Sequence, residues 1–168
     1  MRQDVSELSV TIAEAYKRGN KVLICGNGGL AAESEHFAAE LMGKYGRDIF
    51  IPCISLTGPS SLITALANDI GFQHVFSHQV QGIGNSRDIL IGMTTSASQN
   101  ILNAIWVASH QGLDAWLIHG KAKPYDEGHS ISMDGETTEE IQNNIIKFLH
   151  QVALEAKELA VEDAVHQS

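Results

Sequence analysis

Residues 21–29 read Lys-Val-Leu-Ile-Cys-Gly-Asn-Gly-Gly, an apolar run that enters a glycine-rich turn. The apolar run is short, and its position directly before the glycines predicts a buried strand. A segment rich in Ala and Glu follows from Leu30 to about Leu41 and predicts a helix. A strand, a glycine turn and a helix in this order are typical of a βαβ unit, which favours a parallel sheet.

The same alternation continues on both sides of this stretch. Further strands are predicted at about 50–56, 88–93, 114–118 and 130–133. Further helices are predicted at 5–18, after the Gly58–Ser61 turn, at 72–80, at 101–109 and at 137–163. Thr137 and Glu140 have the spacing of a capping box at the start of the last helix.

The pattern predicts one α/β domain over residues 1–168, without an internal repeat or a linker. We expect a doubly wound, five-stranded, mainly parallel sheet flanked by helices on both faces. In such a sheet, ligands bind at the carboxyl ends of the strands.

Composition narrows the classes of partner. The 168 residues carry 20 acidic and 11 basic side chains, which gives a formal charge of −9. This charge argues against nucleic acid as the main partner. No apolar run approaches the ~20 residues that a membrane helix needs, and no signal peptide is visible, so we expect a soluble, cytoplasmic protein without a membrane partner. Cys25 and Cys53 lie in apolar runs and are expected to be buried free thiols.

Two turns that follow strands are candidate anion sites. In the first, Asn27, Gly28 and Gly29 precede a helix, whose start favours a phosphate. The turn lacks the last glycine of the dinucleotide fingerprint, since Ala31 stands there, and a purely structural tight turn remains the alternative.

The second turn is rich in hydroxyl groups, which can donate hydrogen bonds to a phosphate. It contains Thr94, Thr95, Ser96 and Ser98 between a strand and a helix. The alternative is that one serine caps the helix and the others are solvated.

Two pairs of polar residues lie on otherwise apolar helices. His36 and Glu40 are four residues apart and share a helix face, where Glu40 could act as a general base. Gln142 and His150 are eight apart, about 80° around a helix. The alternative for His36 and Glu40 is an ordinary i,i+4 helix pair, and the alternative for His150 is a histidine of the core. The four side chains together could bind a divalent metal such as zinc.

The other histidines share no spacing typical of a site beyond one i,i+4 pair, and we expect them at the surface or at an interface. They are His74, His78, His110, His119, His129 and His166.

Five segments together resemble the phosphoheptose (sedoheptulose 7-phosphate) isomerases, a family of SIS domains. In order they are KVLICGNGG, EHFAAELMGKYG, ITALANDIGF, DILIGMTTSAS and EEIQNNIIKFLH. The resemblance covers about residues 15–155. It implies a SIS-type fold and an aldose–ketose isomerase that converts sedoheptulose 7-phosphate into D-glycero-D-manno-heptose 7-phosphate for lipopolysaccharide heptose biosynthesis.

The resemblance also implies roles for residues. Glu40 and His150 match the acid/base pair, and together with His36 and Gln142 they match a site that can hold one zinc ion. The hydroxyl-rich turn matches the phosphate loop. Further substrate contacts are implied for Asn27, Gly28, Gly29, Lys44, Asn68, Asp69 and Gln142. Members of the family are homotetramers with sites at subunit contacts.

The chain departs from the family pattern at three places. Leu30 stands where the family has a serine that helps to hold phosphate, and Ala97 stands where it has a glycine in a loop one residue longer. We also expect no helix before residues 5–18, where the family has one. A non-catalytic regulator or adaptor resembling the DnaA initiator-associating protein is the alternative function. Those relatives lose the glutamate and the last histidine, whereas this chain keeps Glu40 and His150, so an enzyme is favoured.

Overall fold

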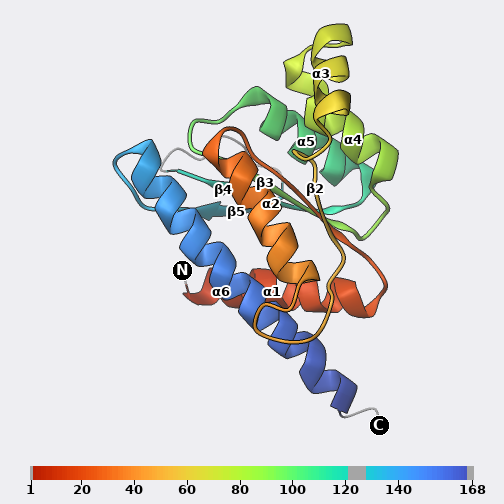
Figure 1. Ribbon diagram of the computed structural model, residues 1–168, viewed down its shortest axis with the longest axis vertical. Coiled ribbons are helices and arrows are strands. Elements are labelled where there is room, and N and C mark those ends of the chain that lie inside the picture. Colours follow the sequence, from red (N-terminus) through yellow and green to blue (C-terminus); the bar gives the residue numbers. More distant parts are fainter. Residues whose placement is uncertain (1, 121–127, 166–168) are drawn as a thin grey trace.

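The computed structural model describes residues 2–120 and 128–165, with side chains for 3–120 and 128–161. Figure 1 shows helices packed on both faces of a central sheet. The strands are β1 (Val22–Cys25), β2 (Cys53–Ser55), β3 (Ile89–Thr94), β4 (Asp114–His119) and β5 (His129–Ser132). The helices are α1 (Arg2–Lys17), α2 (Gly29–Met42), α3 (Ser60–Asp69), the 3-10 turn η1 (Phe72–His74), α4 (Val75–Ile83), α5 (Gln99–Gln111) and α6 (Thr138–Val165).

The sheet has five strands in the order β2-β1-β3-β4-β5, and every neighbouring pair is parallel. This confirms the predicted α/β class and the doubly wound sheet. The direction of winding reverses between β1 and β3, which pair from Val22 with Ile89 to Cys25 with Gly92. In an open parallel sheet, the crevice at such a reversal is where ligands bind.

Two layers of core cover the two faces of the sheet. Successive side chains of a strand point to opposite faces, and Leu23 and Ile24 accordingly belong to different clusters. Ile24 packs with residues of α1, α2 and α6. Leu23 packs with residues of α3, α4 and α5. Because both faces are covered, the central strands are fully buried, which explains their continuous apolar runs.

The predicted element boundaries lie within three residues of those in the structure, and two elements differ in kind or extent. The strand predicted at 50–56 is limited to β2, whose residues Cys53 to Ser55 pair with β1. Pro52 has no N–H to donate to the ladder, although its carbonyl accepts the Val22 N–H at 2.9 Å. The helix predicted at 72–80 begins as η1 and continues as α4 to Ile83. The capping box at Thr137 is confirmed, since the Glu140 N–H donates to Thr137 Oγ1 at 3.2 Å.

The structure also tests the smaller sequence expectations. Cys25 and Cys53 are buried free thiols, as predicted, and burial raises their pKa values well above the ordinary range. The prediction that His119 lies at the surface or at an interface is wrong, because β4 buries it and its Nε2 pairs with Ser130 Oγ at 2.8 Å. His166 lies outside the described residues. Within the described helices, none is both long and apolar enough to cross a bilayer.

Candidate active site at the reversal point of the sheet

The two predicted anion turns meet at the point where the strand order reverses. Asn27, in the turn after β1, and Asn100, in the first turn of α5, exchange two side-chain amide hydrogen bonds of 2.9 Å each. Asn100 is buried, and its Oδ1 also accepts the Ile101 N–H. This pairing fixes the glycine turn to the helix that follows the hydroxyl-rich turn.

Within the hydroxyl-rich turn, the four hydroxyl groups have different surroundings. Thr94 is buried, and its Oγ1 accepts the backbone N–H groups of Ser96 and Ser98 at 3.3 and 3.0 Å. Thr94 Oγ1 also donates to Ser98 Oγ at 3.3 Å. Thr95 and Ser98 are half-buried, and Ser96 is exposed. Thr94 therefore shapes the turn from inside, and Ser96 is the member most open to a ligand.

The two departures from the family pattern have clear structural settings. Leu30, in the first turn of α2, is 2% exposed and packs in the core, so its side chain faces away from a ligand at the turn. Ala97 has φ of 59°, the left-handed region that glycine adopts without strain. The loop thus keeps a backbone conformation suited to glycine although an alanine occupies it.

Gln142 lies against the glycine turn. A Cβ added to Gly29 would stand 2.9 Å from Gln142 Nε2 and 3.1 Å from its Oε1. The absence of a side chain at Gly29 therefore leaves the space that the Gln142 amide fills. A Cβ added to Gly120 would stand 3.0 Å from Ile141 Cδ1 and 3.1 Å from the Thr95 carbonyl oxygen, so the start of α6 lies beside both turns.

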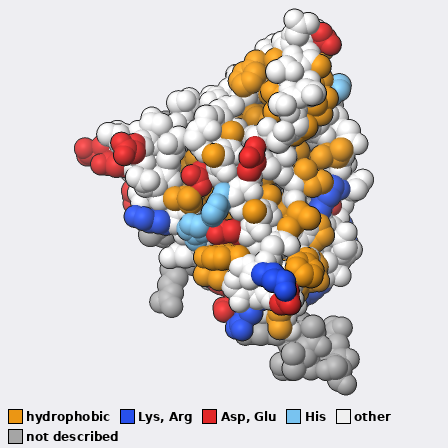
Figure 2. All heavy atoms as spheres, in the orientation of Figure 1, with side chains coloured by type: hydrophobic (Ala, Val, Ile, Leu, Met, Phe, Trp, Pro, Cys, Tyr) orange, Lys and Arg blue, Asp and Glu red, His pale blue; other side chains and the backbone are white. Residues whose placement is uncertain are grey.

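A second polar group lies further along α2 and α6. Glu40 Oε1 accepts a 2.6 Å hydrogen bond from His150 Nδ1, and His36 Nε2 lies 3.1 Å from the same oxygen. The two imidazole rings are edge to face, with centroids 5.2 Å apart. In Figure 2, histidine and acidic side chains lie together on the face formed by α2 and α6.

Burial distinguishes the members of this triad of His36, Glu40 and His150. The Glu40 side chain is 7% exposed, whereas those of His36 and His150 are 51% and 35% exposed. Glu40 Oε2 is buried and has no hydrogen-bond partner in the described structure. A buried carboxylate oxygen without a partner is costly, which suggests that this atom meets a bound ligand.

The triad has the donors of a metal site. One ligand atom from each of the three residues lies within 4.8 Å of the others. Two imidazoles and a carboxylate are a common donor set for zinc. Gln142, the fourth predicted ligand, lies instead beside Gly29, and eight residues of α6, about 12 Å of helix rise, separate its backbone from that of His150.

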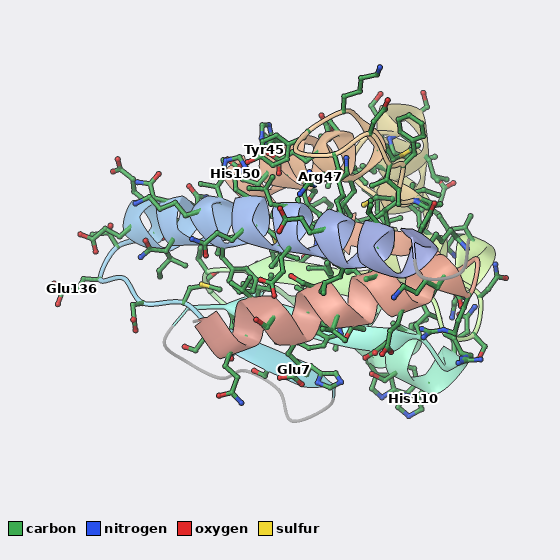
Figure 3. All side chains as sticks on the ribbon, turned by 90° about the horizontal axis from the view of Figure 1, so that it is seen from below. Glu7, Tyr45, Arg47, His110, Glu136 and His150 are labelled. Carbon is green, nitrogen blue, oxygen red and sulfur yellow. The ribbon has the colours of Figure 1, made fainter. Side chains whose placement is uncertain are left out.

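The loop after α2 completes the surroundings of the triad. The ring of Tyr45 lies 6.0 Å from that of His150, and Figure 3 shows the two side by side over α6. Lys44, the predicted substrate contact, is exposed, and its ammonium lies 3.8 Å from Asp48 Oδ2. Lys157, which sequence reasoning missed, is fully buried, and its Nζ donates to the carbonyls of Gly43 and Tyr45 at 2.6 and 3.2 Å.

Asn68 and Asp69 are two further predicted site residues that lie apart from the triad. Both are exposed at the end of α3, where Asn68 Nδ2 donates to Asp69 Oδ1 at 2.9 Å. Figure 1 shows α3 projecting away from the α2 and α6 side of the sheet. Leu66 of α3 packs on the opposite face of the sheet from the core residues of α2 and α6, so Asn68 and Asp69 stand apart from the triad within one chain.

Comparison with known proteins gives consistent matches. The SIS domain family matches residues 2–116. A phosphoheptose isomerase 1 from Campylobacter jejuni is 37% identical over 89% of this chain and 83% of its own length. One from Campylobacter concisus is 40% identical over 84% and 77% of the two chains.

Two solved structures are also similar to the chain. A phosphoheptose isomerase from Francisella tularensis superposes with a TM-score of 0.86 at 28% identity, covering 92% of this chain and 85% of that one. The enzyme GmhA from Neisseria gonorrhoeae gives a TM-score of 0.80 at 31% identity, covering 89% and 84%.

Proposed function

The chain belongs to the phosphoheptose isomerases of the SIS domain family, which are aldose–ketose isomerases of sugar phosphates, and we propose that Glu40 and His150 are its acid/base pair. The substrate is sedoheptulose 7-phosphate and the product D-glycero-D-manno-heptose 7-phosphate, a precursor for lipopolysaccharide heptose. The observation that carries the assignment of the pair is the buried Glu40 carboxylate, with one oxygen bound to His150 and the other without a partner.

The proposed chemistry moves two protons. Glu40 removes a proton from C1 of the ketose and returns it to C2, so the reaction passes through an enediol. His150 takes the proton from the C1 hydroxyl and donates it to the oxygen on C2. The 2.6 Å bond from His150 Nδ1 to Glu40 orients the imidazole and leaves its other nitrogen for this transfer.

Binding of the phosphate is assigned to the reversal point of the sheet. Ser96, Thr95 and Ser98 supply hydroxyl groups, and Thr94 holds the loop in shape. Asn27, Gly28 and Gly29 form the opposite wall, against which the Gln142 amide lies. Lys44, exposed in the loop whose Tyr45 ring lies beside His150, contributes a positive charge toward an anionic substrate.

A zinc ion, one per site, fits the triad of His36, Glu40 and His150. Gln142, the proposed fourth ligand, lies with its amide against Gly29 and would have to turn toward the ion to join the triad. When bound, zinc would act as a Lewis acid that polarises the oxygens on C1 and C2.

We further propose a homo-oligomer, a tetramer by the family pattern, with sites shared between subunits. Asn68 and Asp69 lie away from the triad in one chain, and eleven residues of α2, about 16 Å, separate Gly29 from Glu40. An apolar groove of about 490 Å³ beside α3 contains the exposed side chains of Ile54, Leu62 and Ile83, each 40–42% exposed. Exposed apolar clusters of this kind typically mark contacts. The proposed location is the cytoplasm.

The test is incubation of the purified protein with sedoheptulose 7-phosphate, followed by NMR for the anomeric signals of an aldose. Equilibration of ketose and aldose is expected. Binding of the sugar phosphate without conversion would instead favour the adaptor-like alternative. Sedimentation equilibrium at micromolar concentration tests the oligomer, and a fully active monomer would refute shared sites.

A further inference from the structure

The buried ammonium of Lys157 is hydrogen-bonded to backbone carbonyls of the surface loop that follows α2. Its Nζ donates to the carbonyls of Gly43 and Tyr45, the two neighbours of Lys44. Lys157 is 0% exposed although lysine is almost never fully buried without partners. An uncompensated charge there would be strongly destabilising, so the two carbonyls are its necessary partners.

The pKa of the Lys157 ammonium lies below its ordinary value, because burial disfavours the charged form and the negative charges of Glu40 and Asp48 offset this only in part. Because an ammonium has three donors and no acceptor, it can hold both carbonyls at once, which a neutral apolar side chain cannot do.

The rest of the loop is docked on α6 by contacts around the same lysine. Arg47 pairs with Glu158 at 3.4 Å. Gly46, with φ of 69°, lies so close to α6 that a Cβ there would come within 2.4 Å of Leu154 Cδ2. The Tyr45 ring lies beside His150. The backbone around Lys44 is therefore fixed, while its side chain is 81% exposed.

We propose that Lys157 is a positioning residue for substrate binding: it fixes the backbone on both sides of Lys44 so that this cation faces the anionic substrate beside the triad. The inference rests on the proposed function, because it assigns Lys44 to a sugar phosphate. It adds a buried residue that acts through Lys44 and not on the reacting atoms.

The test is a double-mutant cycle with Lys157→Met, Lys44→Ala and the double variant, using sedoheptulose 7-phosphate. Lys157→Met should raise KM about tenfold and change kcat less than about threefold, the signature of lost binding common to the ground and transition states. In the Lys44→Ala background, Lys157→Met should have little further effect, since residues that act together are not additive. Lys147→Met, an exposed lysine on the same helix, is the control.

Additive effects in the cycle, or a fall in kcat at unchanged KM, would overturn the inference. If Lys157→Met does not fold, Gly46→Ala displaces the same loop from α6 and enters the same cycle, with the same expected KM effect. An unchanged KM in a Gly46→Ala variant whose loop amides exchange faster would also overturn it.

Failure of the proposed function can be told apart from failure of the positioning role of Lys157. If the wild-type protein does not isomerise sedoheptulose 7-phosphate, the cycle is measured as affinity for this compound by isothermal titration. Non-additive loss of affinity then supports the positioning role without catalysis, and additive loss or no binding overturns it.

Discussion

Asn27 and Asn100 form a reciprocal pair of amide hydrogen bonds, 2.9 Å each, across the reversal point of the sheet. The pair joins the turn after β1 to the helix after β3, two segments more than seventy residues apart in sequence. The proposed phosphate site is therefore built from two loops held at a fixed separation.

Asn100→Ala should loosen this site. It removes both bonds and the acceptor of the Ile101 N–H at a buried position, so the free energy of unfolding should fall by about 1–3 kcal/mol. The KM for a sugar phosphate should rise. Urea denaturation and steady-state kinetics measure the two effects, with exposed Gln99→Ala as the control. Unchanged KM in a destabilised protein would limit the pair to a structural role.

Gly29→Ala should separate activity from stability. The new Cβ would meet the Gln142 amide at 2.9 Å, and this flexible group can move away. Alanine is a better helix former than glycine, so the free energy of unfolding should hold or rise slightly. kcat/KM should fall because Gln142 is displaced from the turn. Full activity would show that Gln142 is not needed there.

Ala97→Gly should stabilise the protein by about 0.5–1 kcal/mol, because an alanine with φ of 59° is strained and a glycine is not. Thermal unfolding of the variant measures this. A lower melting temperature would show that the gain in unfolded-chain entropy outweighs the relief of strain.

Asp88 links stability to pH. Burial raises the pKa of its carboxyl, but hydrogen bonds from Lys21, Asn20 and Asn85 outweigh this and hold the pKa below its usual range. A depressed folded-state pKa contributes stability that is full above the unfolded value of about 3.9 and is lost as pH falls through the folded value. Asp88→Asn should therefore be less stable than wild type at pH 7, with the gap narrowing below about pH 4. A gap independent of pH, measured by urea denaturation, would contradict the linkage.

The alternation of apolar runs with amphipathic segments was enough to predict the α/β class, the parallel sheet and most element boundaries. It could not predict the strand order or the Asn27–Asn100 pair, because neither follows from local periodicity. The i,i+4 spacing placed His36 and Glu40 on one face, and the contact with His150 needed the packing of α2 against α6.

Lys157 shows a different limit. In sequence it is one charge on a long helix, where a solvated position is the ordinary expectation. The two carbonyls that compensate its buried charge, those of Gly43 and Tyr45, belong to the loop after α2, which packs against α6 in the folded chain. His119 was missed for a related reason, since its partner Ser130 is on the neighbouring strand.

The decisive prediction for the chemistry concerns Glu40→Gln. A glutamine has the same shape, and its Oε1 can still accept from His150 and His36, so folding should survive. The buried Oε2 is replaced by an amide that cannot take a proton from carbon, so kcat should fall at least ~10²-fold.

Circular dichroism and thermal unfolding check that the Glu40→Gln protein is folded, and metal analysis of both proteins shows whether zinc content changes as well. Glu35→Gln, on an exposed face of α2, is the matched control and should keep the wild-type rate. A Glu40→Gln protein with near wild-type kcat would remove Glu40 as the base. A folded variant that is inactive but regains activity with added zinc would instead assign Glu40 to metal binding, because a lost general base is not restored by a metal.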